Sequence, residues 1–303
     1  MSLPSPAAQA VRPIDARAAE RARLRLERAG SAPWLHQEAA RRMAQRLPLL
    51  KHPPRRLLDW WPSAGGSRGA LREALPDASL LQRIDAGAPA RVAGGWRGWL
   101  RSLASDPVRW TEDVPPQSCD MLWANMLLHH VADPGALLAQ WNEALAVDGV
   151  LMFTTLGPGT LQRLRDLYRQ PGWGPPMGEL VDMHDIGDQL VEAGFADPVM
   201  DQETLCLTWS QAADALIELR TLGANVAPSR RPGLRTPRWR QRLLESLVLE
   251  AATPPSGRVA LDFEIIYGHA FKPQPRHPLA PEVRIGLDDL RRTLKRPTPD
   301  RSG

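Results

Sequence analysis

The stretch RLLDWWPSAGGSRGALREALPDASLLQRID, residues 56 to 85, constrains the fold more than any other part of the chain. A short apolar run over Leu57 to Trp60 is followed by a turn of small residues, a segment with helical spacing over Arg68 to Leu75, and a second apolar run over Ser79 to Ile84. Strand, helix and strand in this order form a right-handed crossover that leaves the two strands parallel. The stretch therefore predicts an α/β protein whose parallel sheet carries helices on both faces.

The later part of the chain continues this alternation. Strands are predicted at Val108 to Thr111 and in CDMLWA, VLMFTTLG, PVMDQETLCLTW and VALDFEIIYGHAFK. Helices are predicted in PGALLAQWNEALA, with Asp133 as the cap, in DMHDIGDQLVEAG, with Asp182 as the cap, and over 160–170, 210–223 and 236–251. Ligands of such sheets bind at the carboxyl ends of the parallel strands, so candidate site residues are sought there.

Composition and patterning divide the chain into three parts. Residues 1–52 are predicted to form an N-terminal helical extension or lid, 53–273 the main domain with a helical insertion at about 210–252, and 274–303 a mostly disordered tail. The net charge of +4 is only mildly basic, and no recognised nucleic-acid-binding module accompanies it. Two cysteines, no apolar run long enough for a membrane span and no secretory signal predict a reduced, cytoplasmic setting without a membrane partner.

Three segments of the first half together resemble a class I S-adenosylmethionine (SAM) methyltransferase. They are LLDWW with the following GG and acidic residue, CDMLWANMLLHHVADP, and LAVDGVLMFTTLGPGTLQRLRDLY. The segments VDMHDIGDQLVEAGFADPVMDQETLCLTW and YGHAFKP are more specific, because they resemble the malonyl-carrier-protein O-methyltransferases of biotin synthesis. They are also similar to the mitochondrial relatives that act as assembly factors for respiratory complex I. The resemblance covers about residues 14 to 273.

This resemblance implies a Rossmann-like class I methyltransferase fold with a mostly parallel seven-stranded sheet and a helical insertion before the last strand. It also implies SAM as the cofactor. In the family's first motif, Asp59 fits the acidic position and Gly65 keeps the third glycine, whereas Trp61 stands at the first. The resemblance further implies that Asp85 binds the ribose of SAM and that Asn125 lines the pocket.

The turn after the first strand leaves open whether SAM binding is retained. Glycine in such a turn lets the backbone approach a ligand and adopt positive φ, whereas Pro62 cannot donate an N–H group. A shift in register within AGGSRG would let Gly65 and Gly66 rebuild the turn, and without this shift the pocket is vestigial.

The implied acceptor is the carboxylate of a malonyl group on an acidic acyl carrier protein. A carboxylate is already a nucleophile at neutral pH, so no catalytic base is assigned. It does require an orienting cation or N–H donor, for which Arg17, Tyr168 and His184 are candidates. Six arginines in PSRRPGLRTPRWRQR, among them Arg230, Arg231 and Arg235, predict either a solvated face or a surface that binds an acidic carrier protein.

Two alternatives remain open from the sequence. One is a catalytically impaired methyltransferase-like protein that acts as a binding or assembly factor. The other is a protein-arginine hydroxylase-like relative, for which an iron site of Asp and His residues would be suitable. No metal site is predicted, because the adjacent residues His129 and His130 are expected to point apart and Asp182 and His184 do not share a helix face.

Overall fold

The computed structural model describes residues 12–83, 109–253 and 257–275. The chain divides into two compact units, Met1–Pro273 and Gln274–Gly303, and the sheet lies in the first. Of the predicted tail, only Gln274 and Pro275 are among the described residues.

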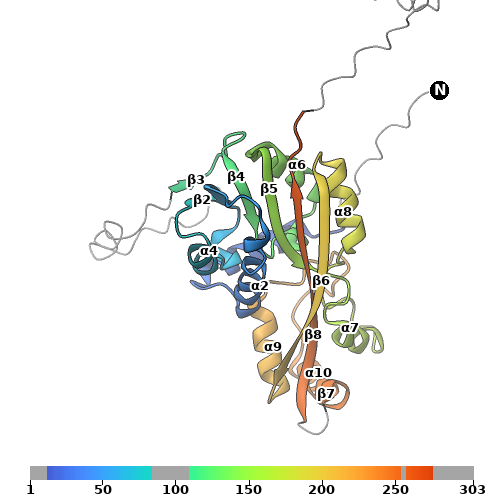
Figure 1. Ribbon diagram of the computed structural model, residues 1–303. Coiled ribbons are helices and arrows are strands. Elements are labelled where there is room, and N and C mark those ends of the chain that lie inside the picture. The colour runs from blue at the N-terminus through green and yellow to red at the C-terminus, as the bar shows by residue number, and fades with distance from the viewer. Residues whose placement is uncertain (1–11, 84–108, 254–256, 276–303) are drawn as a thin grey trace, which may run out of the picture. The chain divides into compact units, whose positions relative to one another are not determined.

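The described part of the first unit contains one eight-stranded sheet. Seven strands follow each other in the order β3-β2-β1-β4-β5-β8-β6, and the two-residue β7 pairs with β8 (Figure 1). The strands are β1 (Arg56–Asp59), β2 (Ser79–Arg83), β3 (Arg109–Thr111), β4 (Cys119–Ala124), β5 (Leu145–Leu156), β6 (Ala196–Trp209), β7 (Ala252–Thr253) and β8 (Arg258–Phe271). β1 to β5 pair in parallel, whereas β8 is antiparallel to β5, β6 and β7. The mostly parallel sheet is confirmed, and the short β7 raises the expected seven strands to eight.

The helices surround this sheet, and all but the one-turn α3 lie where the hydrophobic periodicity indicates. They are α1 (Ala16–Arg28), α2 (Trp34–Ala44), α3 (Pro62–Gly65), α4 (Arg68–Ala74), α6 (Pro134–Ala144), α7 (Gln162–Arg169), α8 (Met183–Glu192), α9 (Ala212–Thr221) and α10 (Pro237–Ala251), with the 3₁₀ turns η1 (Leu47–Leu49) and η2 (Leu128–His130). Asp133 caps α6 and Asp182 caps α8, each through a side-chain oxygen that accepts from a first-turn N–H group. Both predicted caps are confirmed.

Alternation along the strands supplies two hydrophobic cores. Leu57 and Met121 belong to a cluster that includes α2 and α4, whereas Leu58 and Leu122 belong to a second cluster that includes α6 and α8. Neighbouring residues of a strand point to opposite faces, so each strand anchors helices on both sides of the sheet.

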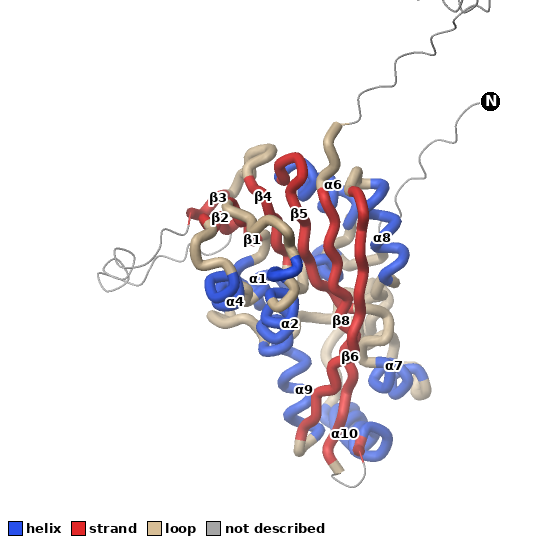
Figure 2. The backbone as a smooth tube through the Cα atoms, in the orientation of Figure 1, coloured by secondary structure: helices blue, strands red, loops and turns tan. Residues whose placement is uncertain are grey.

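The predicted helical insertion lies between β6 and β8, as α9 and α10. Both strands have 14 residues, and Figure 2 shows them continuing past the other strands toward these two helices. Leu243 and Leu247 of α10 are buried in the cluster that also contains Phe263 of β8. The insertion is thereby packed onto the strand extensions near the carboxyl end of β5. Among the described residues, no helix is both long and apolar enough to cross a bilayer.

Candidate active site at the carboxyl ends of the strands

The turn that follows β1 carries two tryptophans that belong to different hydrophobic clusters. Trp60 packs edge-on against Trp141 of α6, with ring centroids 6.1 Å apart. Trp61 belongs instead to a small cluster with Leu26 of α1 and Ala64 of α3, and only 3% of its surface is exposed. α3 begins at Pro62, whose missing N–H group is not needed in a first helical turn. Trp61 therefore occupies the carboxyl end of β1, beneath α1.

Gly66 completes this turn in the left-handed conformation, with φ of +68°. A Cβ atom at this position would lie 2.6 Å from the Cβ of Ala32 and 3.0 Å from the Cγ of Gln37. Gly66 alone therefore adopts positive φ within AGGSRG, because Gly65 ends α3, and SAM binding by this turn stays a prediction. The close approach that glycine permits is made by Ala32, between α1 and α2, and by Gln37 of α2.

Replacing Gly66 by alanine is expected to lower the free energy of unfolding by about 2 kcal/mol or more, because left-handed backbone and steric overlap both oppose a Cβ atom. Gly69 is the matched control, since nothing lies within 4 Å of a Cβ placed there and the residue is in α4. Gly69→Ala is expected to raise stability by up to about 1 kcal/mol. Urea denaturation of both variants measures the difference, and effects of the same sign would contradict this account of the turn.

Asn125, directly after β4, is completely buried and fully engaged in hydrogen bonds. Its Nδ2 donates to the carbonyl oxygens of His36 at 2.7 Å and Gly65 at 2.5 Å, and its Oδ1 accepts from Thr154 Oγ1 at 2.6 Å. Asn125 thus ties the turn after β1 to α2 and β5. The hydrogen bonds of Asn125 stabilise the turn after β1. A direct contact between Asn125 and SAM stays a prediction.

Asp59 ends β1 as a buried carboxyl group. Gln82 Nε2 of β2 donates to its Oδ2 at 3.3 Å, while Oδ1 has no hydrogen-bond partner among the described residues. Burial raises the pKa of Asp59 to about 7, against the smaller lowering effects of hydrogen bonds from Gln82 and the Trp61 backbone. Asp59 is therefore a buried group at the carboxyl end of an inner strand, in contact with β2. Asp85, the predicted ribose ligand, lies outside the described residues.

A buried aromatic and imidazole cluster adjoins Trp61. The ring centroid of Trp61 lies 6.3 Å from that of His36 and 5.6 Å from that of His130. The ring centroids of His129 and His130 are 4.1 Å apart. Burial lowers the pKa of His36 to about 4 and that of His130 to about 3, so both rings are neutral near pH 7. Trp61 Nε1 and His130 Nε2 have no hydrogen-bond partner among the described residues.

The expectation that His129 and His130 point apart is wrong. They lie in the 3₁₀ turn η2, where the chain geometry differs from that of the α-helix or strand assumed from the sequence. Among the described residues, no group of three or more His, Cys, Asp or Glu side chains has a metal-binding arrangement.

A cavity of about 580 Å³ begins beside this cluster. His129 and His130 of η2 and Leu156 at the carboxyl end of β5 line it on the side of the sheet. Side chains from α1, α7, α9, α10, β8 and the segments that precede α8 and α10 also line it, among them Arg25, Leu164, Leu219, Arg220, Arg235, Arg240, Leu243 and Phe263. A mostly apolar cavity with a few cationic groups at this end of the sheet is typical of a substrate site. We call it the carboxyl-end cavity.

Two of the predicted substrate residues, Tyr168 and Arg235, come together in this lining. Both contact an aromatic cluster: the Tyr168 ring lies 5.6 Å from Trp173 and 5.9 Å from Trp239, and the Arg235 guanidinium lies 4.6 Å from the Trp239 ring centroid. The two tryptophans were missed from the sequence. Two sequence features could have indicated them. Trp239 stands between arginines in PRWRQR, and Trp173 lies in the Gly/Pro loop that precedes α8.

Arg230 instead holds α1 in place. Its Nη2 pairs with Asp15 Oδ2, the N-cap of α1, at 2.6 Å. Farther along the helix, Arg25 Nη1 donates to the Gly223 carbonyl oxygen at 3.2 Å. Both contacts join α1 to the chain between α9 and α10. The structure thus gives Arg230 a positioning role that differs from the predicted docking role.

The remaining predicted substrate residues do not line the carboxyl-end cavity. Arg17 and Arg231 are exposed, on α1 and in the connection before α10 respectively. The His184 side chain is 79% exposed, and its Nδ1 lies 2.7 Å from Asp182 Oδ1 at the start of α8. Orientation of a substrate carboxylate by Arg17 or His184 stays a prediction, as does binding of a carrier protein by Arg231.

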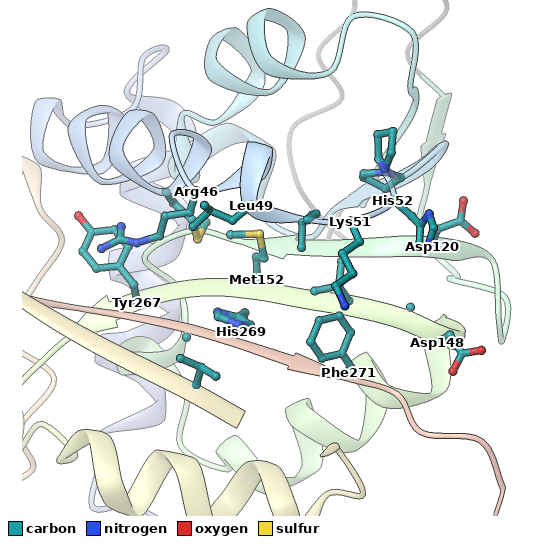
Figure 3. A pocket seen from close by; sticks show the side chains of 18 of the residues that line it. Arg46, Leu49, Lys51, His52, Asp120, Asp148, Met152, Tyr267, His269 and Phe271 are labelled. Atoms are coloured by element: carbon teal, nitrogen blue, oxygen red, sulfur yellow. The ribbon is translucent and has the colours of Figure 1, made fainter. Parts of the chain in front are cut away.

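A larger cavity of about 920 Å³ lies near the amino ends of β1 and β4. Figure 3 shows Met152, His269 and Phe271 of the sheet beneath the segment that carries Leu49 and Lys51. Parallel α/β sheets bind ligands at the opposite, carboxyl end. Size alone therefore does not make this cavity the candidate active site.

The strand order, with its antiparallel β8 beside β5, and a substrate-sized cavity at the carboxyl ends define a Rossmann-like methyltransferase fold. Among solved structures, the YcgJ protein from Bacillus subtilis matches with a TM-score of 0.53 at 12% identity, over 78% of this chain and 99% of that one. This likeness concerns the fold alone.

Sequence comparison then identifies the family. No family model matches the chain. It is 36% identical over 273 residues to the malonyl-[acyl-carrier protein] O-methyltransferase of Laribacter hongkongensis, covering 86% of this chain and 88% of that protein. It is 33% identical over 282 residues to the enzyme of that name from Halorhodospira halophila, covering 88% and 92%. The chain belongs to the malonyl-[acyl-carrier protein] O-methyltransferase family.

Proposed function

We propose that this protein transfers a methyl group from SAM to the free carboxylate of a malonyl group carried by an acyl carrier protein, a step of biotin synthesis. The single observation that carries the proposal is the carboxyl-end cavity. Its aliphatic walls suit an acyl chain, and four arginines against one glutamate, Glu179, make it favourable for an anionic end group. Membership of the family agrees with this assignment.

The chemistry requires alignment more than acid or base catalysis. SAM, when bound, supplies an electrophilic methyl group, and the malonyl carboxylate is ionised at neutral pH. The protein must therefore hold the carboxylate in line with the methyl–sulfur bond of SAM and exclude water. Proximity and orientation of the two reactants can then supply most of the rate enhancement. The aliphatic walls of the carboxyl-end cavity exclude water, and its arginines orient the anion.

The residues between the turn after β1 and the carboxyl-end cavity fit the charged amino-acid end of SAM. Trp61 Nε1 offers an unpaired N–H donor, and the neutral His130 offers an unpaired ring nitrogen at Nε2. These groups would hold the carboxylate and ammonium of SAM, because buried polar atoms of this kind need partners. Gly66 would shape the turn that places Trp61.

Exposed arginines near the start of α10 support an acidic carrier protein as the partner. Arg231, Arg238, Arg240 and Arg242 are all exposed on this part of the insertion, close in sequence to the cavity residue Arg235. A cluster of one sign steers and orients a partner of the opposite sign. The carrier would dock here and deliver its acyl group into the carboxyl-end cavity.

A non-catalytic binding or assembly protein is the second candidate function. The observation that favours it is Trp61, which is buried between α1 and the turn where the family places SAM. In this alternative, Trp61 and α1 permanently close the cofactor site, and the insertion binds a protein partner.

Calorimetric titration with SAM and an assay of methyl transfer to malonyl-loaded acyl carrier protein separate the two candidates. We expect SAM binding, transfer to the malonyl-loaded carrier, and rescue of a bacterial strain that lacks this step of biotin synthesis. The matched control is acetyl-loaded carrier protein, which has no free carboxylate and should accept no methyl group. Absence of SAM binding at millimolar concentration, with folded protein, would favour the binding or assembly function.

A further inference from the structure

The lining of the carboxyl-end cavity contains two buried hydrogen-bond donors that have no acceptor among the described residues. They are Arg235 Nη1 and Trp239 Nε1. The two side chains are in contact, because the Arg235 guanidinium lies 4.6 Å from the Trp239 ring centroid. Two contacting side chains of the lining therefore each carry one unpaired donor.

The surrounding side chains hold this pair in a fixed geometry. Arg235 Nη2 donates to the Trp173 carbonyl oxygen at 2.6 Å. Trp173 packs edge-on against Trp239 with centroids 5.3 Å apart, and Tyr168 packs against both indoles. One edge of the guanidinium is thus anchored while the other stays unpaired, which is the arrangement of a preorganised binding group.

The unpaired cation has a physical cost. A buried charged donor without an acceptor loses its hydration and gains no hydrogen bond in return. Other arginines of the insertion and its surroundings avoid this cost, since Arg230 pairs with Asp15 and Arg165 donates to the Pro158 carbonyl oxygen. Burial lowers the pKa of Arg235 and also that of Arg165, so the missing acceptor, and not the pKa, distinguishes Arg235. Of these three arginines, only Arg235 has a buried nitrogen, Nη1, without a hydrogen-bond acceptor among the described residues.

We propose that Arg235 and Trp239 form a carboxylate-binding site that selects acyl groups with a free carboxyl end over acyl groups with a methyl end. The fork of the guanidinium suits the two oxygens of a carboxylate, and the indole N–H is a second donor. This inference rests on the proposed function, because it names the group that recognises the substrate of that reaction.

The site also accounts for release of the product. Methylation converts the anion into a neutral ester, which accepts weaker hydrogen bonds from the guanidinium. The pair therefore binds the substrate more tightly than its methyl ester.

The test compares binding of S-malonyl- and S-acetyl-N-acetylcysteamine to the full chain by calorimetry. Wild-type protein is expected to prefer the malonyl compound. Arg235→Gln is expected to weaken malonyl binding about 10- to 100-fold and to change acetyl binding less than about twofold, because one charge-assisted hydrogen bond is lost. Trp239→Phe keeps the ring, removes the N–H donor, and should weaken malonyl binding about 5- to 10-fold. Arg163→Gln, at an exposed position of α7, is the matched arginine control.

The outcomes separate this inference from the proposed function. Equal loss of both ligands in Arg235→Gln, or no malonyl preference in the wild type, overturns the carboxylate site even if methyl transfer is observed. Arg235-dependent malonyl binding without methyl transfer supports the site and overturns the proposed function. Thermal unfolding of each variant identifies a loss of fold, and Arg235→Lys, which keeps the charge, should retain part of the malonyl preference.

Discussion

Replacing Trp61 by alanine is expected to lower the free energy of unfolding by about 3 kcal/mol or more, because a large buried side chain leaves a cavity. Trp61 is 3% exposed and packs with Leu26 and Ala64. Its replacement by alanine therefore removes the packing contact between α1 and the turn after β1. The unpaired Nε1 keeps the expected loss toward the lower end of the range for tryptophan. Guanidinium denaturation monitored by circular dichroism measures the change.

Trp34 supplies the matched control for this prediction. It begins α2 and is 50% exposed, so Trp34→Ala should cost less than about 1 kcal/mol. A loss of similar size in both variants would show that Trp61 is not held as described. A double-mutant cycle with Leu26→Ala tests the contact itself, and coupling near zero would contradict it.

Replacing Asp59 by asparagine is expected to remove a pH-dependent part of the free energy of unfolding that amounts to about 4 kcal/mol between pH 4 and pH 8. Burial raises the pKa of Asp59 to about 7, from an ordinary value of 3.8. Between these values the unfolded chain loses a proton that the folded protein keeps, so the free energy of unfolding falls as pH rises, by about 1.4 kcal/mol per pH unit. The stabilising contribution of the neutral carboxyl group is complete below pH 3.8 and lost above pH 7.

Urea denaturation of wild type and Asp59→Asn between pH 4 and pH 8 checks this expectation. Because asparagine stays neutral, the variant should gain stability relative to wild type as pH rises, and the contributions of other groups cancel in the difference. Asp77→Asn, at an exposed position before β2, controls for the loss of one carboxyl group. Parallel profiles for wild type and Asp59→Asn would refute a raised pKa.

The sequence predicts the strands and most helices because their hydrophobic periods are strong. The runs around Leu57, Leu80 and Leu151 each continue over several residues, and β1, β2 and β5 form there. The single turn α3 has no such period, since four residues are too few to show one. The two-residue β7 is missed for the same reason, and it changes the strand count.

Side-chain partners in the site depend on tertiary contacts that periodicity does not contain. Arg230 and Arg235 look alike in one basic segment, yet the first pairs with Asp15 and the second lies against Trp239. Asn125 occupies the predicted position, but its amide is used by the carbonyl groups of His36 and Gly65. Position along the chain can be predicted from the pattern, whereas the direction of each side chain depends on the packing of distant segments.

The fit between the turn after β1 and the N-terminal helices makes the effects of substitutions depend on one another. Gly66 accommodates Ala32, and Trp61 fills the space beside Leu26. Replacing Trp61 by glycine in one step would leave a cavity under α1 before it improved any contact with a ligand. A glycine-rich turn at this position would therefore require compensating substitutions in α1, so the sequence of the turn and that of the N-terminal helices are expected to be interdependent.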